Sequence, residues 1–187
     1  MKDEELGGDQ EGDWDIIDRV AEYGQNGYFI YAQSRNNMIT PEKDNAGFAR
    51  WVQNNAKQLV EILGEGRHYG EWCGSAIQRR YGLSGKKFAL FNTHRWKDLT
   101  YHPDGGLMGG QLTVVPVLAE GYMDNPGQVA LDCMNKLKKQ GSAFSPGFMD
   151  PEGVVMRHNP SGTVFKKTFD YDEQGKWAEK QDRKENT

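Results

Sequence analysis

Apolar residues recur along the chain in two rhythms, one typical of helices and the other of strands. Between residues 45 and 63 they recur every three or four positions, which predicts an amphipathic helix of about five turns that ends at Gly64. A second stripe with the same spacing begins at Asn125-Pro126, a capping residue followed by a proline at the first helical position, and ends at Gly141. The sequence therefore predicts two helices.

Shorter runs rich in β-branched and aromatic residues predict strands. These runs cover residues 28–33, 67–72, 87–92, 112–118, 152–157 and 163–169. Pro116 argues for a bulge or an edge strand in the fourth run, because proline has no amide hydrogen to donate to a neighbouring strand. The last two runs flank the turn sequence Asn159-Pro-Ser-Gly162 and so predict a hairpin. This order indicates an α+β fold with mainly antiparallel strands.

Composition is that of an ordinary folded protein. The chain has 187 residues, of which 36% are hydrophobic and 27% charged, and its 23 glycines indicate many tight turns. No apolar run approaches the roughly 18 residues of a membrane span. The N-terminus also lacks the basic flank and apolar core of a signal peptide. Because Cys73 and Cys133 lie far apart in such a chain, we expect reduced thiols and a cytoplasmic protein.

Charge is distributed unevenly along the chain. Residues 1–27 hold nine acidic and two basic side chains, a balance of −7 against −4 for the whole chain, so residues 28–187 sum to +3. We expect residues 1–27 to be acidic and loosely ordered, residues 28–172 to form the folded domain, and residues 173–187 to form a charged tail. A basic body suits a phosphate-rich partner, although a solvated charged face explains the same pattern.

Five short segments have residues that suit chemistry. They are Ser34-Arg35, Tyr69-Gly-Glu-Trp-Cys-Gly74, Phe88-Ala-Leu-Phe91, Glu152-Gly-Val-Val155 and Phe165-Lys166-Lys167. Glutamates beside glycines at strand ends can hold a ribose hydroxyl or a divalent metal, basic residues can hold phosphate, and an aromatic ring can stack on a base. Each segment alone is more simply explained as structural. Together they describe a site for a nucleoside triphosphate, without the Walker phosphate-binding loop.

In their order along the chain, these segments resemble motifs Ia, III, IIIa, IV and V of the covalent nucleotidyltransferases, and in particular of the phage-type nick-sealing RNA ligases. The resemblance runs from about residue 28 to residue 169. It implies an adenylyltransferase core, an ATP-grasp-like nucleotidyltransferase fold of two mainly antiparallel sheets with flanking helices. The nucleotide would lie between the sheets, and the helix of residues 45–63 would pack outside them.

The resemblance also implies which residues bind ATP. They are Arg35, Glu71, Phe91, Glu152, Lys166 and Lys167. Glu71 would bind the ribose, Phe91 would stack on adenine, and Glu152 would serve the catalytic Mg²⁺. Arg35 and the two lysines would contact phosphate, and Arg35, Glu71 and Lys166 would be the catalytic residues. The family often has a second basic residue two positions after the first lysine of motif V, where this chain has Thr168.

The activity that the resemblance implies is joining of RNA 3′-hydroxyl and 5′-phosphate ends through AMP intermediates, in the cytosol of a bacterium or a phage-infected host. The substrate would be RNA ends or a nicked duplex. In that chemistry a lysine of a KxDG or KxHG motif attacks the α-phosphorus of ATP, and pyrophosphate leaves with the help of Mg²⁺. The lysine should lie roughly 15–20 residues before Arg35, by ordinary hairpin lengths. No lysine lies there, and a faint echo of the motif places Glu5 at the position of the nucleophile.

Several explanations of the missing lysine remain open. A truncated chain would have lost the lysine together with its hairpin, and the core sheet would then lack a central strand and have unpaired edges. A pseudo-ligase would bind nucleotide or RNA ends without adenylating itself, and Lys2 could otherwise reach the site on a flexible arm. Sealing of a pre-adenylated RNA end needs no lysine nucleophile and could survive its loss.

A metal hydrolase is an alternative of a different class. Its ligands would come from His68, His94, His102, His158 and Cys73. The chain has no HxxxH or HxH spacing, and histidines near strand ends are more often structural, so this interpretation has little support in the sequence.

Overall fold

The computed structural model describes residues 15–22, 28–35, 37–44, 46–77, 80–101 and 107–169. The chain divides into two compact units, one spanning Asp9–Pro116 and the other Met1–Gly8 with Val117–Thr187. The described part of the first unit, residues 15–116, is called the sheet body here. The described part of the second, residues 117–169, is called the hairpin unit.

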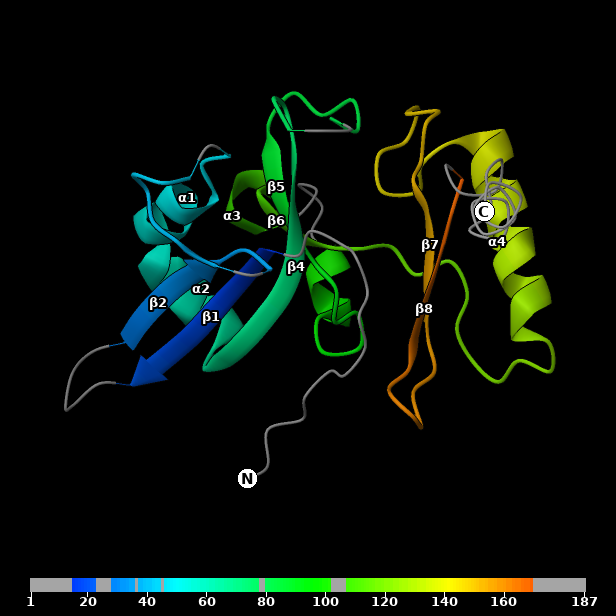
Figure 1. The fold of residues 1–187 in the computed structure, drawn as a ribbon, viewed down its shortest axis with the longest axis horizontal. Helices are drawn as coiled ribbons and strands as arrows, with labels where there is room; N and C mark the ends of the chain where they lie inside the picture. The colour runs from blue at the N-terminus through cyan, green and yellow to red at the C-terminus, as the bar shows by residue number, and fades with distance from the viewer. Residues whose placement is uncertain are drawn as a thin grey trace, which may run out of the picture. The chain divides into compact units, whose positions relative to one another are not determined.

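The sheet body is built on a six-stranded sheet in the order β3-β2-β1-β4-β5-β6 (Figure 1). The strands are β1 (Asp15–Glu22), β2 (Tyr28–Gln33), β3 (Met38–Ile39), β4 (Gly66–Gly74), β5 (Lys86–Leu90) and β6 (Leu112–Val114). Neighbouring strands are antiparallel except β5 and β6, which are parallel. The α+β class and the mainly antiparallel pairing predicted from the sequence are confirmed.

β1 lies within the acidic segment that was expected to be loosely ordered, and the structure differs from that expectation over Asp15–Glu22. This segment pairs with β2 on one side and with β4 on the other, so it is a central strand. The described strands form one sheet from β3 to β6, with β1 between β2 and β4. The other residues of the segment 1–27 lie outside the described ranges, and the domain boundaries at residues 28 and 172 stay predictions.

α1 (Phe48–Asn54) and α2 (Ala56–Leu63) pack on one face of this sheet. The sequence predicted one continuous helix over residues 45–63, and the structure breaks it at Asn55, whose φ and ψ are −115° and 13°. The side-chain amide of Asn55 donates to the carbonyl oxygen of Trp51 at 2.8 Å. Asparagine side chains compete in this way with regular helix hydrogen bonds, so the break has a local cause.

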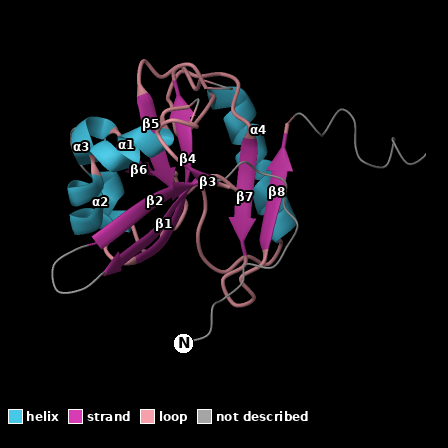
Figure 2. Cartoon of the chain, turned by 60° about the vertical axis from the view of Figure 1, so that its left-hand side comes forward, coloured by secondary structure: helices cyan, strands magenta, loops and turns pink. Residues whose placement is uncertain are grey.

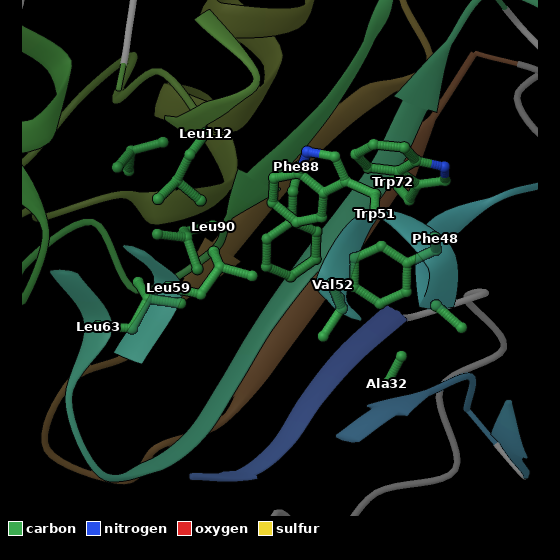
Figure 3. Packing of buried hydrophobic residues seen from close by; sticks show 12 residues of the cluster. Ala32, Phe48, Trp51, Val52, Leu59, Leu63, Trp72, Phe88, Leu90 and Leu112 are labelled. Atoms are coloured by element: carbon green, nitrogen blue, oxygen red, sulfur yellow. The ribbon is translucent and has the colours of Figure 1, made fainter. Parts of the chain in front are cut away.

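Aromatic rings form the centre of the core between these helices and the sheet (Figure 3). Phe48 and Trp51 of α1 meet Trp72 of β4 and Phe88 of β5, with ring centroids 4.9 to 6.1 Å apart. The indole N–H of Trp72 donates to the Ala46 carbonyl at 3.0 Å, so this buried polar group is satisfied. Burial of each such ring contributes about 1.5–3 kcal/mol, and the core therefore holds the sheet firmly against its helices.

Two short helical segments lie between β5 and β6, where the sequence predicted none. They are η2 (Lys97–Tyr101) and α3 (Leu107–Gly110), and the second contains the left-handed residues Met108 and Gly109. β6 ends at Val114, earlier than the predicted residue 118, and it is an edge strand of the sheet. The edge position predicted from Pro116 is therefore confirmed.

The hairpin unit contains α4 (Pro126–Gln140) and the antiparallel pair β7 (Gly153–Arg157) and β8 (Val164–Thr168) (Figure 2). The predicted cap of α4 is confirmed, since the Asn125 side chain accepts a hydrogen bond from the Gln128 backbone N–H at 3.0 Å. Met134 and Leu137 are the buried side chains of α4, which packs against β7. The predicted hairpin over residues 152–169 is confirmed with slightly shorter strands. None of the helices in the described ranges has the length and apolar character needed to cross a bilayer.

Candidate functional site

The face of the sheet opposite α1 and α2 carries Glu71 and Phe91. Side chains alternate between the two faces along a strand. On β4 the buried Trp72 belongs to the core below the helices, so Glu71 lies on the other face, called the second face here. On β5, Phe88 and Leu90 belong to that core, which places Phe91 on the second face as well. Both Glu71 and Phe91 are half-buried.

Strand register brings Glu71 and Phe91 together. Glu71 pairs with Ala89, and the backbone N–H of Phe91 donates to the Tyr69 carbonyl at 2.9 Å. Glu71 and Phe91 are therefore diagonal neighbours on adjacent strands. Such neighbours are about 7–8 Å apart, which is within reach of aromatic and long side chains. A carboxylate and an aromatic ring at this separation can meet two parts of one small molecule.

Arg35 comes just after the end of β2, in the sheet that carries Glu71. It follows β2 in a turn in which the Ser34 backbone N–H donates to the Asn37 carbonyl at 2.8 Å. Ile16 of β1 pairs with both Gln33 and Tyr69, so the row of Gln33 is the row of Tyr69. Arg35 follows Gln33 by two residues at this end of β2, as Glu71 follows Tyr69 by two residues on β4. Three of the predicted residues therefore lie at one end of the sheet.

The glycines around Glu71 have a packing explanation. A Cβ atom at Gly70 would lie 2.6 Å from the Ala89 carbonyl oxygen and from the Phe88 ring. At Gly74, where φ is +125°, a Cβ atom would collide with the Gly85 carbonyl oxygen. Close approach of β4 to β5 thus requires both glycines, and it fixes the backbone on either side of Glu71.

The hairpin unit brings Glu152 and Lys166 together. Glu152 comes directly before β7, and its side-chain oxygen Oε1 lies 2.6 Å from Nζ of Lys166 on β8. Both side chains are about one-third exposed (33% and 34%), and such ion pairs contribute only about 0.2–1 kcal/mol. The Phe169 N–H donates to the Glu152 carbonyl at 3.0 Å, which holds the backbone of Glu152 against the end of β8.

Lys166 and Lys167 leave the hairpin from opposite faces. Val155 pairs with Lys166 and Val154 with Lys167, and successive residues of a strand point to opposite sides. Thr168, two residues after Lys166, shares its face and is buried. The prediction that both lysines contact phosphate stays a prediction.

The position expected for a lysine nucleophile falls on β1. A window of 15–20 residues before Arg35 covers residues 15–20, and β1 reads DIIDRVAE, without lysine. β1 nevertheless pairs with the strand that leads to Arg35 and with the strand that carries Glu71. Lys2 and Glu5, the other residues considered for this role, lie outside the described ranges.

His68 has a structural environment. It is 2% exposed, its Nε2 lies 3.0 Å from the Gly64 carbonyl oxygen, and its ring centroid is 5.7 Å from that of Trp96. Burial lowers the pKa of His68 below its ordinary value of 6.5, and the Arg95 charge lowers it further, whereas the hydrogen bond to Gly64 opposes the shift. Within the ranges that the structure describes, no group of three or more histidine, cysteine or acidic residues could hold a metal ion.

Sequence reasoning missed one pair of residues on the second face. Phe29 and Tyr31 of β2 alternate with Ile30 and Ala32, which belong to the core cluster. The two rings are 47% and 43% exposed. The available signal was the alternation within residues 28–33. Phe29 and Tyr31 lie two positions apart there, so one face of the strand carries aromatic side chains and the other face carries core residues.

Comparison with known proteins identifies the fold. The RNA ligase family profile matches residues 19–169. Among solved structures, a Naegleria gruberi RNA ligase with PPi superimposes with a TM-score of 0.55 at 17% sequence identity, over 88% of this chain and 49% of that one. The chain thus spans about half the length of this ligase and shares its fold. No curated protein gives a significant match. Because the family profile covers most of its length, the chain belongs to the RNA ligase family.

Proposed function

We propose that the chain binds an adenine nucleotide on the second face of the sheet body and acts on RNA ends. The placement of Glu71 and Phe91 as diagonal neighbours, with Arg35 in the turn after β2 at the same end of the sheet, is the observation that carries this proposal. A carboxylate accepts hydrogen bonds from ribose hydroxyls, a ring stacks on adenine, and a guanidinium holds phosphate. The Naegleria ligase is described with PPi, which is consistent with phosphate contacts in this fold.

The reaction that this chain's residues support best is sealing of a pre-adenylated RNA 5′ end. The 3′-hydroxyl oxygen of one strand forms a bond to the 5′-phosphorus of the other, and the bond from that phosphorus to AMP breaks. AMP leaves with the electron pair, and the hydroxyl proton passes to solvent. In the sheet body Glu71 and Phe91 would orient the AMP and Arg35 would offset the negative charge of the phosphates. In the hairpin unit Lys166 is a separate candidate for a phosphate contact.

Self-adenylation is left out of this proposal because β1 has no lysine in the window expected for the nucleophile. The same observation favours a second candidate function, a pseudo-ligase that binds nucleotide or RNA ends without turnover. The two candidates share the nucleotide site and differ only in whether a strand is sealed. One assay of sealing can therefore separate them.

Glu152 is the described residue that fits a magnesium role. Mg²⁺ is often bound through one or two carboxylates together with substrate phosphates and water, so a single glutamate next to bound phosphate is a sufficient protein contribution. The ion would neutralise charge on the phosphates. Because Glu152 is paired with Lys166, it would have to share its carboxylate between the ion and this lysine.

The nucleotide site can be tested by calorimetry with ATP and with AMP. We expect Glu71→Ala to weaken binding at least about tenfold, the loss of roughly one charge-assisted hydrogen bond. Glu61→Ala is the matched control, since Glu61 is an exposed glutamate of α2 on the opposite face of the sheet. Unchanged affinity of a folded Glu71→Ala protein would count against the ribose role.

The sealing step can be tested with pre-adenylated donor RNA, an acceptor with a 3′-hydroxyl, and Mg²⁺. A ligated product supports the ligase proposal, and no product at high protein concentration supports the pseudo-ligase. A parallel incubation with ATP, followed by intact mass measurement, shows whether the chain gains one AMP. Such a gain would contradict the absence of self-adenylation, and peptide mapping would identify the lysine.

A further inference from the structure

Two aromatic rings on β2 form a small exposed surface. Phe29 and Tyr31 are 47% and 43% exposed, and their ring centroids lie 6.3 Å apart with an angle of 17° between the ring planes. Aromatic rings whose centroids are about 4.5–7 Å apart are in contact and stabilise each other. The two rings therefore form one continuous apolar surface. Because Ile30 and Ala32 point into the core, both rings lie on the second face, the face that carries Glu71.

Charged side chains share the second face with the two rings. Arg67 and Glu71 of β4 and Lys87 of β5 belong to this face, and Gln33 follows the rings on β2. Surfaces that dock other proteins are usually larger and more continuously apolar. Exposed rings on a sheet face that also carries basic side chains are instead an arrangement with which sheets stack unpaired nucleobases.

β2 connects the two rings to the turn that carries Arg35. β3 pairs with Ala32 and Gln33, the two residues that follow Tyr31 on β2. β2 then leads from the rings to Arg35, four residues after Tyr31, a separation of up to about 13 Å. An RNA strand that lies on the rings can therefore continue to the end of the sheet where Arg35 and Glu71 stand.

We propose that Phe29 and Tyr31 are a stacking platform for unpaired bases of an RNA strand that runs along β2 toward the nucleotide site. This inference rests on the proposed function and names the part of the chain that holds the RNA. Every base has a π-face, so the platform would bind RNA with little sequence preference. It would supply affinity, while the phosphate contacts near Arg35 would fix the position of the RNA end.

The test compares two RNA ligands by fluorescence anisotropy. One is a labelled single-stranded oligouridylate, and the other is an abasic oligonucleotide of the same length and charge. Stacking on each ring predicts that Phe29→Ala and Tyr31→Ala each raise the Kd for oligouridylate about 5- to 100-fold. Phe29→Tyr and Tyr31→Phe keep a ring and should stay within about twofold of the unsubstituted chain.

Met38→Ala is the matched control, because Met38 is 62% exposed on the neighbouring β3 and has no ring. It should leave the Kd unchanged. The abasic ligand should bind the unsubstituted chain and the double alanine variant equally weakly, since it offers nothing to stack. Amide hydrogen exchange of β1 and β2 confirms that each variant keeps its fold.

Three results would overturn the platform. One is an unchanged Kd for oligouridylate in the double alanine variant, and another is equal binding of the abasic ligand and oligouridylate by the unsubstituted chain. The third is a dimer in sedimentation that Phe29→Ala dissociates without effect on RNA, which would assign the rings to a second copy of the chain. If ATP binding still depends on Glu71 in any of these cases, the proposed function stands without the platform. Ring-dependent RNA binding without ATP binding would overturn the nucleotide site alone.

Discussion

The sheet body and the hairpin unit support their candidate residues in different ways. Glu71 and Phe91 stand on a six-stranded sheet whose other face is sealed by an aromatic core. Lys166 stands on β8 and Glu152 directly before β7, the strand that packs against α4, whose buried side chains are Met134 and Leu137. A two-stranded hairpin is marginal unless a helix or further strands support it. The comparison teaches that the residues predicted to bind base and ribose stand on a larger packed scaffold than Glu152 and Lys166, which are predicted to bind the metal and phosphate.

The largest expected effect is the loss of stability when a core ring is removed from the sheet body. Phe88→Ala removes a fully buried ring and should lower the free energy of unfolding of the sheet body by about 3–5 kcal/mol. Phe165→Ala in the hairpin unit, where the ring is 59% exposed, should cost less than about 1 kcal/mol. Urea denaturation followed by hydrogen exchange on peptides of each region gives both values. Equal costs would contradict the comparison.

A single added methyl group should break the hairpin unit without reaching the sheet body. At Gly153, where φ is +152°, a Cβ atom would collide with the Lys167 carbonyl oxygen across the strand pair. We expect Gly153→Ala to cost about 3 kcal/mol, the upper end of backbone strain. Gly162→Ala is the control, since its φ of +69° meets no atom within 4 Å, and it should cost only about 1 kcal/mol.

Amide hydrogen exchange of β7 and β8 measures the loss of stability that Gly153→Ala causes in the hairpin unit. Protection of β4 and β5 amides should stay unchanged, because the collision lies within the hairpin. Lost protection in both regions would show that they unfold together, which would contradict the comparison.

Acid should weaken the sheet body through His68. Burial lowers the pKa of His68 in the folded chain, whereas the unfolded chain takes up the proton near pH 6.5. The stabilisation is therefore complete above about pH 6.5 and is lost as the pH falls from there toward the folded pKa, by up to about 1.4 kcal/mol per pH unit. Urea midpoints between pH 7.5 and 5.5 measure this slope. In His68→Gln the part of the slope due to this ring should vanish, and an unaltered slope would exclude His68 as its source.

The smallest stability effect belongs to the ion pair of the hairpin unit. Lys166→Met should change the free energy of unfolding by only about 0.2–1 kcal/mol, because both charges are partly solvated. If Lys166 contacts phosphate, the same variant should lose more than tenfold in ATP affinity by calorimetry. Lys167→Met is the matched control on the opposite face of the hairpin. A larger loss in the control would assign the phosphate contact to Lys167.

Local chemistry made much of the fold predictable. Asn125 and Pro126 mark the start of α4 in any context, and the turn of residues 159–162 sets the hairpin. β1 was missed because its acidic residues conceal the alternation of apolar and polar positions that is typical of a strand. One of its partners, β4, is also distant in sequence. The break at Asn55 was missed because apolar spacing continues through it, and only the side-chain bond to Trp51 reveals it.

The candidate site was predictable as a set of residues and not as a geometry. Each motif named its own residue, but only the register of β1 shows that the end of β2, which Arg35 follows, is level with Tyr69, two residues before Glu71. The opposite directions of Lys166 and Lys167 follow from strand alternation, which becomes usable once the bounds of β8 are known. Phe29 and Tyr31 were missed because a strand-forming aromatic residue is usually assigned to the core.

The central position of β1 has a consequence for the order in which the chain folds. β1 is the first of the described strands to be made, and β2 soon follows it, but its other partner carries His68, 51 residues after Ile17. The β1–β4 pairing must close this long loop, so it is expected to be slow to form. During synthesis one edge of the β1–β2 hairpin stays unpaired until α1, α2 and β4 have emerged. Newly made chains are thus most prone to aggregation in that interval, when an exposed edge can pair with another copy.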